Sequence, residues 1–260
     1  MDSPQAVQNQ RMNQFTGAQQ IEDLTADALQ FIAELNRFAE SVLGGPQIGL
    51  TDRDQFLLAH RWRMLRFSQG IESTAAGGLI DPAGALLRVL IELWYVLVAI
   101  ADNPDKLSDL FSQGQAEGRN ALEGLKQLGP DERDDLLTDD FLDAEMANLN
   151  AGTKFVAHNW AGLAKSKGNY VTIYRLLCRH SHGGSAGTCD YFDGLNTDSP
   201  RLRPNIPRRL APEYCLTAAS LMFDALTVLP LQTMTDDRKT KLLRMQTTLN
   251  TFRVRADKRD

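Results

Sequence analysis

The sequence predicts an all-α protein, a multi-helix bundle of about seven to nine helices. Apolar residues recur at steps of three and four along most of the 260-residue chain, which places them on one face of a helix. Capping residues, glycine pairs and prolines separate these segments, and no clear strand pattern is found. A hydrophobic content of 43% is enough for one core, so we expect a single helical domain over residues 19–256 after a disordered tail at 1–18.

The first two predicted helices are separated by a break rich in glycine. Apolar spacing predicts the first helix over residues 19–43, and a Gly-Gly-Pro sequence follows it directly. Thr51, with Asp54 three residues later, has the pattern of an N-cap for the second helix. That helix is expected to end before the Gly77-Gly78 pair.

The third segment, residues 84–101, is the most apolar and is nearly long enough to cross a membrane. Arg88 and Glu92 lie inside it, and each charge near a bilayer centre would cost about 3 kcal/mol. We therefore interpret it as a buried core helix that begins at Asp81-Pro82, and we expect no membrane partner.

The remaining helices are predicted on both sides of a long loop. Residues 183–211 are rich in glycine, serine, asparagine, aspartate and proline, and loops of this length are usually functional or disordered. The predicted helices before this loop cover 105–128, 138–149, 154–165 and 170–182, and those after it begin at Pro212 and Thr235. We expect the 84–101 helix to pack against the helices at 170–182 and 212–229.

The cell compartment follows from the cysteines and the N-terminus. The three cysteines form no CxxC pair, so neither a disulfide framework nor a zinc knuckle is indicated. The N-terminus has no charged region followed by an apolar one, as a signal peptide would have. We expect a cytoplasmic protein.

The charge of the chain changes sign along its length. Residues 102–145 contain 13 acidic and 4 basic side chains, whereas residues 146–189 contain no acidic side chain. The following loop adds four arginines that are candidate anion-binding residues: Arg201, Arg203, Arg208 and Arg209. Because the net charge is −5, any anion site must be local, and RNA or another anionic ligand is one explanation for this basic zone. Docking of the basic zone on the acidic segment is the other, and both stay open.

The candidate site is the end of the helix at 170–182, where the sequence reads YRLLCRHSHGG. Positions seven apart return to nearly the same face of a helix, so Arg175 and His182 share a face. Arginine can hold a phosphate, and histidine can move a proton at a 2′-hydroxyl or a leaving oxygen without metal. We therefore take His182 and Arg175 as candidate catalytic residues. The supporting residues on or beside this stripe are Tyr174, Cys178 and Arg179.

This arrangement resembles that of HEPN-type ribonucleases, helical bundles with an Arg-x(4–6)-His signature near a helix end. The stretch from Arg175 to His180 fits the shorter spacing and the stretch to His182 fits the longer one, which the face geometry favours. Leu176 stands where a polar residue commonly follows the HEPN arginine.

Residues 80–190 are also similar to a bacterial family of unknown function that has an Arg-x3-Glu helix and a Tyr-x3-Ser-x3-His helix. Arg88 and Glu92 match the first motif, and Tyr174, Cys178 and His182 match the second, with cysteine in place of serine. The resemblance implies a HEPN-like helical fold and an inward-facing cluster of arginine, glutamate, tyrosine and histidine. It implies no established activity.

Each candidate residue also has a purely structural explanation. His182 before Gly183-Gly184 fits a helix end that is stabilised by a cation and a glycine cap. Arg88 and Glu92 fit a buried ion pair that fixes helix register. His60, among several arginines, is interpreted as part of a half-exposed basic helix face.

No metal or cofactor is expected, because the histidines form neither Glu-x-x-His pairs nor an HExxH motif, and the nucleotide-binding glycine motifs are missing. Two functions from different classes remain. The first is a HEPN-like RNA-binding or metal-independent RNA-cleaving protein, in a stress or phage-defence setting that only the resemblance implies. The second is a non-catalytic helical protein-interaction module. Either is compatible with a homodimer.

Overall fold

The computed structural model describes residues 4–181, 192–193, 201–202, 210–228 and 231–257. Within this part of the chain the fold is all-α, as predicted, with nine α-helices longer than three residues. The α-helices are α1 (Pro4–Leu43), α2 (Asp52–Ala76), α3 (Ile80–Asp102), α4 (Lys106–Gln127), α5 (Asp139–Ala147), α6 (Ala157–Leu163), α7 (Lys167–Asn169), α8 (Arg175–Ser181), α10 (Leu210–Thr227) and α11 (Asp236–Asp257). The short elements are a 3-10 turn η1 (Pro130–Glu132), a π-helical turn η2 (Tyr170–Tyr174) and an antiparallel pair of two-residue strands, β1 (Phe192–Asp193) and β2 (Arg201–Leu202).

Local sequence signals account for the ends of α2. The Thr51 side chain accepts a hydrogen bond from the Asp54 amide and the Asp54 carboxylate accepts one from the Thr51 amide, which is the predicted cap in its two-sided form. At the other end Gly78 adopts a left-handed φ of 74°, and the Leu79 amide donates to the Thr74 carbonyl oxygen at 2.8 Å. The chain therefore turns sharply from α2 into α3.

The start of α3 differs from the prediction. The N-cap is Leu79 and the helix begins at Ile80, so Asp81 lies in the first turn instead of capping it. Pro82 causes no loss there, because the first amides of a helix have no carbonyl partner within the helix. Burial of the Ile80 side chain, which is 2% exposed, favours the earlier start.

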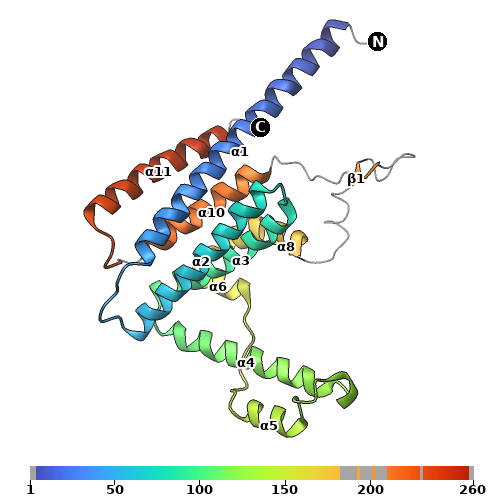
Figure 1. The fold of residues 1–260 in the computed structure, drawn as a ribbon, viewed down its shortest axis with the longest axis vertical. Helices are drawn as coiled ribbons and strands as arrows, with labels where there is room; N and C mark the ends of the chain where they lie inside the picture. Colours follow the sequence, from blue (N-terminus) through green and yellow to red (C-terminus); the bar gives the residue numbers. More distant parts are fainter. Residues whose placement is uncertain (1–3, 182–191, 194–200, 203–209, 229–230, 258–260) are drawn as a thin grey trace.

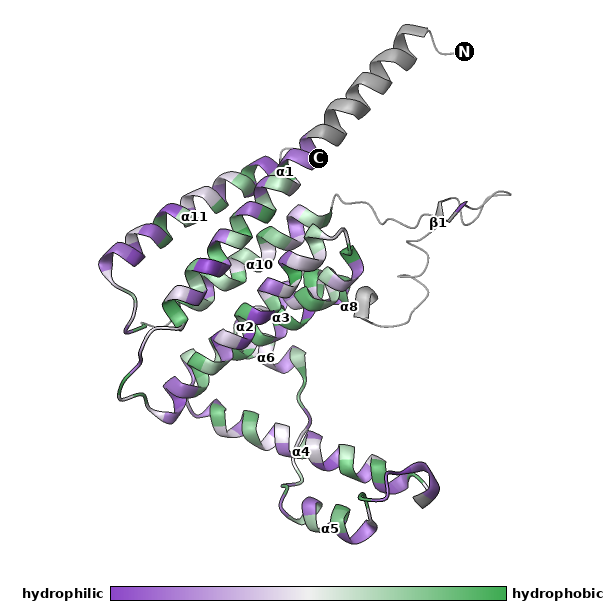
Figure 2. Ribbon diagram, viewed as in Figure 1, coloured by the Kyte–Doolittle hydropathy of each residue, from purple (hydrophilic) through white to green (hydrophobic). Residues whose placement is uncertain are grey.

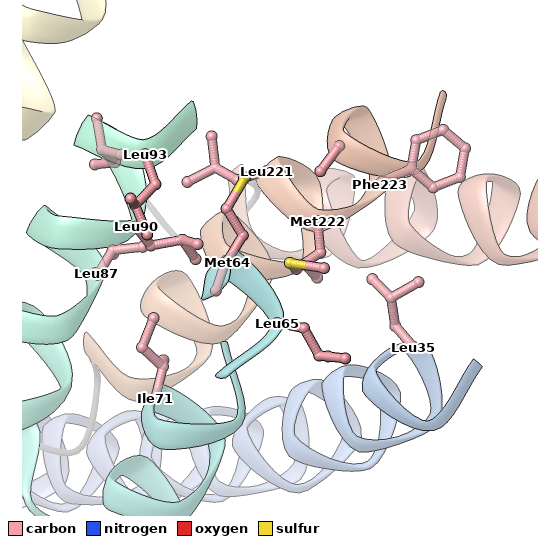
Figure 3. Close-up of a cluster of buried hydrophobic side chains, with 14 of the residues drawn as sticks. Leu35, Met64, Leu65, Ile71, Leu87, Leu90, Leu93, Leu221, Met222 and Phe223 are labelled. Atoms are coloured by element: carbon pink, nitrogen blue, oxygen red, sulfur yellow. The ribbon is translucent and has the colours of Figure 1, made fainter. Parts of the chain in front are cut away.

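The core lies where α1, α2, α3 and α10 meet, and α6 and α8 pack on another side of α3. Figure 3 shows Leu87 and Leu90 of α3 facing Met64 of α2 and Met222 of α10, with Leu35 of α1 at the edge of the cluster. The predicted packing of α3 on the helices at 170–182 and 212–229 is thus confirmed. In the described chain α3 is long and apolar enough to cross a membrane, but most of that stretch is buried inside the bundle.

A small polar network fixes α1 against α2 within this core. The Ser68 hydroxyl donates to the Asn36 side-chain oxygen at 2.7 Å, and the Asn36 amide donates to the Glu72 carboxylate at 2.8 Å. Ser68 and Asn36 are buried, so these hydrogen bonds satisfy groups that would otherwise be costly to remove from water.

The α4–α5 hairpin, residues 106–150, contacts the bundle through the start of α4 and projects from one end of the molecule (Figure 1). Its buried side chains are Ala116, Leu142 and Met146, and its outer surface mixes polar and apolar positions (Figure 2). Much of the predicted acidic segment therefore forms a projecting arm.

Two predictions of organisation stay predictions. Helix α1 begins at Pro4 and so includes most of residues 1–18, whose sequence predicts a disordered tail. The loop at 183–211 lies largely outside the described residues, apart from β1, β2 and the first residues of α10.

Candidate functional site

A three-residue cluster joins α3 to the segment that leads into α8. Arg88 and Glu92 are four residues apart on α3, so both side chains lie on one helix face, and that face meets Tyr174. Arg88 Nη2 is 3.2 Å from Glu92 Oε1 and donates to the Tyr174 hydroxyl oxygen at 2.8 Å. The Tyr174 hydroxyl in turn donates to Glu92 Oε1 at 2.5 Å. The three groups form a closed hydrogen-bonded ring.

The electrostatics of this ring keep Tyr174 and Arg88 in their ordinary charge states. Burial, followed by the hydrogen bond and the charge of Glu92, raises the pKa of Tyr174 well above its ordinary value. Burial by itself lowers the pKa of Arg88, but Glu92, Tyr174 and Cys178 more than offset it, so that pKa is raised. At neutral pH Tyr174 is a protonated donor and Arg88 a cation, which suits a positioning device better than a proton acceptor.

Aromatic rings surround Tyr174. The Tyr170 ring stacks on it with centroids 4.8 Å apart and planes at 19°, and the Tyr95 ring centroid lies 6.4 Å away. His158 meets Tyr170 edge to face at 5.0 Å. The Tyr95 hydroxyl is buried with no hydrogen-bond partner among the described residues, and burial raises the pKa of Tyr95 to about 12. This side of α3 is therefore a rigid aromatic wall around one ion pair.

Cys178 lies one helical turn after Tyr174 and is half-buried. Its side chain hydrogen-bonds Arg88. The thiol therefore contacts the arginine as a weak hydrogen-bonding group.

Arg175 is not part of this cluster. Tyr174 and Leu177 are buried, whereas Arg175 and Leu176 are exposed, so the chain presents the arginine to solvent beside an anchored tyrosine. The cluster brought together by the fold is thus Arg88, Glu92, Tyr174 and Cys178, and Arg175 lies outside it.

The remaining predicted site residues are only partly described. Arg201 lies in β2 and is exposed, and Arg179 lies in α8 although its side chain is not described. The residues outside the described part of the chain are His182, Arg203, Arg208 and Arg209.

The described basic side chains of residues 146–189 form few ion pairs with the acidic segment. Within the described residues, a single ion pair joins the two, between Lys165 Nζ and Asp102 at 3.1 Å, and Lys165 is 82% exposed. Lys154, Lys167 and Arg175 are exposed and form no ion pair in that part of the chain. Docking of the two zones on each other therefore leaves most of these charges open to solvent.

The interpretation of His60 as part of a half-exposed basic face is wrong, because His60 and Arg61 are both buried. His60 Nε2 lies 2.9 Å from the Leu93 carbonyl oxygen, and burial lowers the pKa of His60 to about 4. Arg61 Nε donates to the Ala225 carbonyl oxygen at 2.7 Å, and burial lowers its pKa to about 10. The signal was present in the sequence, since both positions fall within the stripe of apolar residues of α2.

The described part of the chain contains no cluster of side chains that could bind a metal ion. No group of three histidine, cysteine, aspartate or glutamate side chains there is placed to hold an ion.

Comparison with known proteins gives one match. A protein-family model covers residues 54–200, more than half of the chain, from the first turn of α2 to beyond α8, and it describes a family of unknown function. No curated protein and no solved structure matches the chain.

Proposed function

Because the chain belongs to DUF5677, a family of unknown function, its activity has to be argued from its own residues, and we propose that it is a HEPN-like RNA-binding protein. The observation that carries the proposal is the exposed Arg175, directly after the buried Tyr174 and within a stretch that contains no acidic residue. A guanidinium held in this way can pair with a phosphate in a two-point hydrogen bond.

The position of Arg175 supports the proposal because its neighbour is fixed. The Tyr174 ring is stacked on Tyr170 and its hydroxyl is held by Arg88 and Glu92. The backbone that bears Arg175 is therefore anchored on α3. This anchoring reduces the conformational entropy that is lost when a ligand binds. Lys167 and Lys154 add exposed positive charge on the same acid-free stretch.

The catalytic form of the proposal uses His182 and Arg175 without metal. His182 takes the proton from a ribose 2′-hydroxyl, whose oxygen attacks the adjacent phosphorus while the bond from phosphorus to the 5′ oxygen breaks. Arg175 stabilises the negative charge that develops on the phosphoryl oxygens. The leaving 5′ oxygen takes up a proton from water, and the products are a cyclic 2′,3′-phosphate and a 5′-hydroxyl. The hydrogen-bonded ring of Arg88, Glu92 and Tyr174 acts here as a positioning device for Arg175.

The proposal places the protein in the cytoplasm, where RNA is available. The described cysteines, Cys178 and Cys215, are free thiols, as a reducing compartment would maintain.

A gel assay on RNA separates binding from cleavage. We expect Arg175→Ala to weaken binding by about tenfold at low salt and to reduce the salt dependence by roughly one released counterion. If the protein cleaves, His182→Ala abolishes the product while binding survives, and a chelator changes neither result. His180→Ala is the matched control, because five residues place it on another face from Arg175.

The second candidate is the helical interaction module, favoured by the projecting hairpin with its exposed Phe111 and Phe141. Wild-type protein that neither binds nor cuts RNA at low salt, with the folding of each variant matched by thermal melts, would contradict the RNA proposal. The interaction module would then be the remaining function.

A further inference from the structure

A pocket of about 440 Å³ lies between α2, α3 and α4, on the side of α3 where the hairpin joins the bundle. Its wall carries apolar side chains from all three helices, and Phe155 from the segment before α6 completes it. Phe56 and Phe111 meet edge to face at 5.8 Å across two of these helices, and Phe111 is 57% exposed. The pocket thus offers aromatic faces that a bound molecule would cover.

The acidic groups in this wall are hydrogen-bond acceptors. Glu92 takes part through a carboxylate whose Oε1 binds both Arg88 and Tyr174, while no described residue hydrogen-bonds Oε2. Glu117 faces the pocket from α4, and its Oε1 accepts a hydrogen bond from the Phe155 amide at 3.3 Å. Both carboxylates therefore retain acceptor capacity toward a ligand.

The basic groups of this wall are one neutral imidazole, His60, and one guanidinium, Arg63. His60 donates from Nε2 to the Leu93 carbonyl oxygen, and a pKa lowered to about 4 by burial keeps its ring neutral above that pH. Arg63 is exposed and belongs to the pocket wall on α2. The acidic hairpin forms the opposite wall.

A glycine keeps the pocket open. Gly114 lies in the middle of α4, where glycine lowers helix stability, and a Cβ added there would meet no atom within 4 Å. Gly124, also in α4, has the same free space but does not line the pocket. A side chain added at Gly114 would therefore enter the pocket, whereas one added at Gly124 would not.

We propose that this pocket binds a small organic cation, a flat aromatic body that carries an ammonium or guanidinium group. The aromatic walls bind the body of the ligand, and the carboxylates of Glu92 and Glu117 accept from its charged head. An anionic ligand would meet the carboxylates of Glu92 and Glu117 against the one guanidinium of Arg63, so this site differs in charge preference from the surface around Arg175.

Calorimetric titration with three indoles of matched shape tests the proposal. Tryptamine carries an ammonium group, 3-ethylindole is uncharged and indole-3-propionate carries a carboxylate. We expect tryptamine to bind more tightly than 3-ethylindole by about tenfold, and indole-3-propionate to give no measurable heat. Binding of indole-3-propionate as tight as that of tryptamine would overturn the assigned ligand class, and no binding of any of the three would overturn the pocket.

Two leucine substitutions locate the binding. Gly114→Leu fills the pocket and should weaken tryptamine binding by at least about tenfold, whereas Gly124→Leu adds the same side chain elsewhere on α4 and should leave the affinity unchanged. Both variants should fold, because leucine is a better helix former than glycine. Equal affinities for the two variants would place tryptamine elsewhere and overturn the proposal.

Two charge variants complete the test. Glu117→Gln keeps the acceptor oxygen but removes the charge, so it should weaken tryptamine binding about threefold to tenfold and leave 3-ethylindole unaffected. Unchanged tryptamine binding by Glu117→Gln would contradict the role of that carboxylate. Arg175→Ala should bind tryptamine as the wild type does, so a failure of RNA binding and a failure of this pocket give different results.

Discussion

Helices α3 and α4 follow each other in the chain and have nearly the same length, 23 and 22 residues, yet they are stabilised differently. Twelve residues of α3 are buried, compared with Ala116 alone in α4. The hairpin instead has exposed ion pairs, such as Arg119–Glu123 and Lys126–Asp143. A buried leucine contributes about 1.5–3 kcal/mol, whereas an exposed ion pair contributes about 0.2–1 kcal/mol.

The molecule therefore has two levels of stability. The α4–α5 hairpin should open without the bundle, because it has few buried apolar contacts and much exposed backbone. The pocket between α2, α3 and α4 therefore has a firm wall, formed by α2 and α3 of the bundle, and a movable wall, formed by α4.

The largest effect is expected for a pair of leucines, each fully buried. Leu90→Ala, in α3, should lower the free energy of unfolding by about 2–5 kcal/mol, because it leaves a cavity in the core. Leu142→Ala, in α5, should hardly change the global urea midpoint but should speed amide hydrogen exchange in residues 139–147. Equal shifts of the midpoint for both would show that hairpin and bundle unfold as one unit.

The next effect is a loss of stability in acid that arises from His60, in the firm wall. Its pKa is about 4 in the folded protein and ordinarily about 6.5, so between these values the unfolded chain takes up a proton that the folded protein does not. Stability should be complete above pH 6.5 and fall by about 2–3 kcal/mol as the pH drops to 4. Urea unfolding at several pH values should show a smaller fall for His60→Gln, which retains a hydrogen-bond donor. A parallel fall in both proteins would assign the acid effect to carboxylates instead.

The smallest effect compares one carboxylate from each wall. Glu92→Ala should lower the free energy of unfolding by about 2 kcal/mol, because it leaves Arg88 and the Tyr174 hydroxyl without their acceptor in a largely buried place. Glu117→Ala should change it by no more than about 0.5 kcal/mol, since Glu117 is exposed. Indistinguishable urea midpoints would mean that water replaces Glu92 at little cost.

The fold could be predicted from the sequence, and so could the cluster of Arg88, Glu92 and Tyr174, because both follow from helical spacing. The stripe of α3 predicts a core helix, and the four-residue spacing of Arg88 and Glu92 puts them on one face toward Tyr174. The burial of His60 and Arg61 does not follow from residue type, because polar side chains are mostly exposed, whereas here the carbonyl oxygens of Leu93 and Ala225 satisfy both groups inside the core.

The pocket could not be predicted from spacing. It depends on how α4 leaves the bundle after Asp102, and no periodicity in the sequence specifies that direction. The position of Gly114 could be read as a helix interior, but the free space beside it is a tertiary property.

The π-helical turn between α7 and α8 makes the orientation of this segment depend on the number of residues in it. A π turn holds one residue more than an α turn, and such turns occur frequently at functional sites. Removing one residue, for example Thr172, would leave Tyr174 on α3 but rotate Tyr170 by about 100° around the helix axis. The stacking of Tyr170 on Tyr174 would then be lost although neither tyrosine had changed. In this part of the molecule a deletion acts as a rotation, so chain length, as much as side-chain chemistry, sets the direction in which Tyr170 faces.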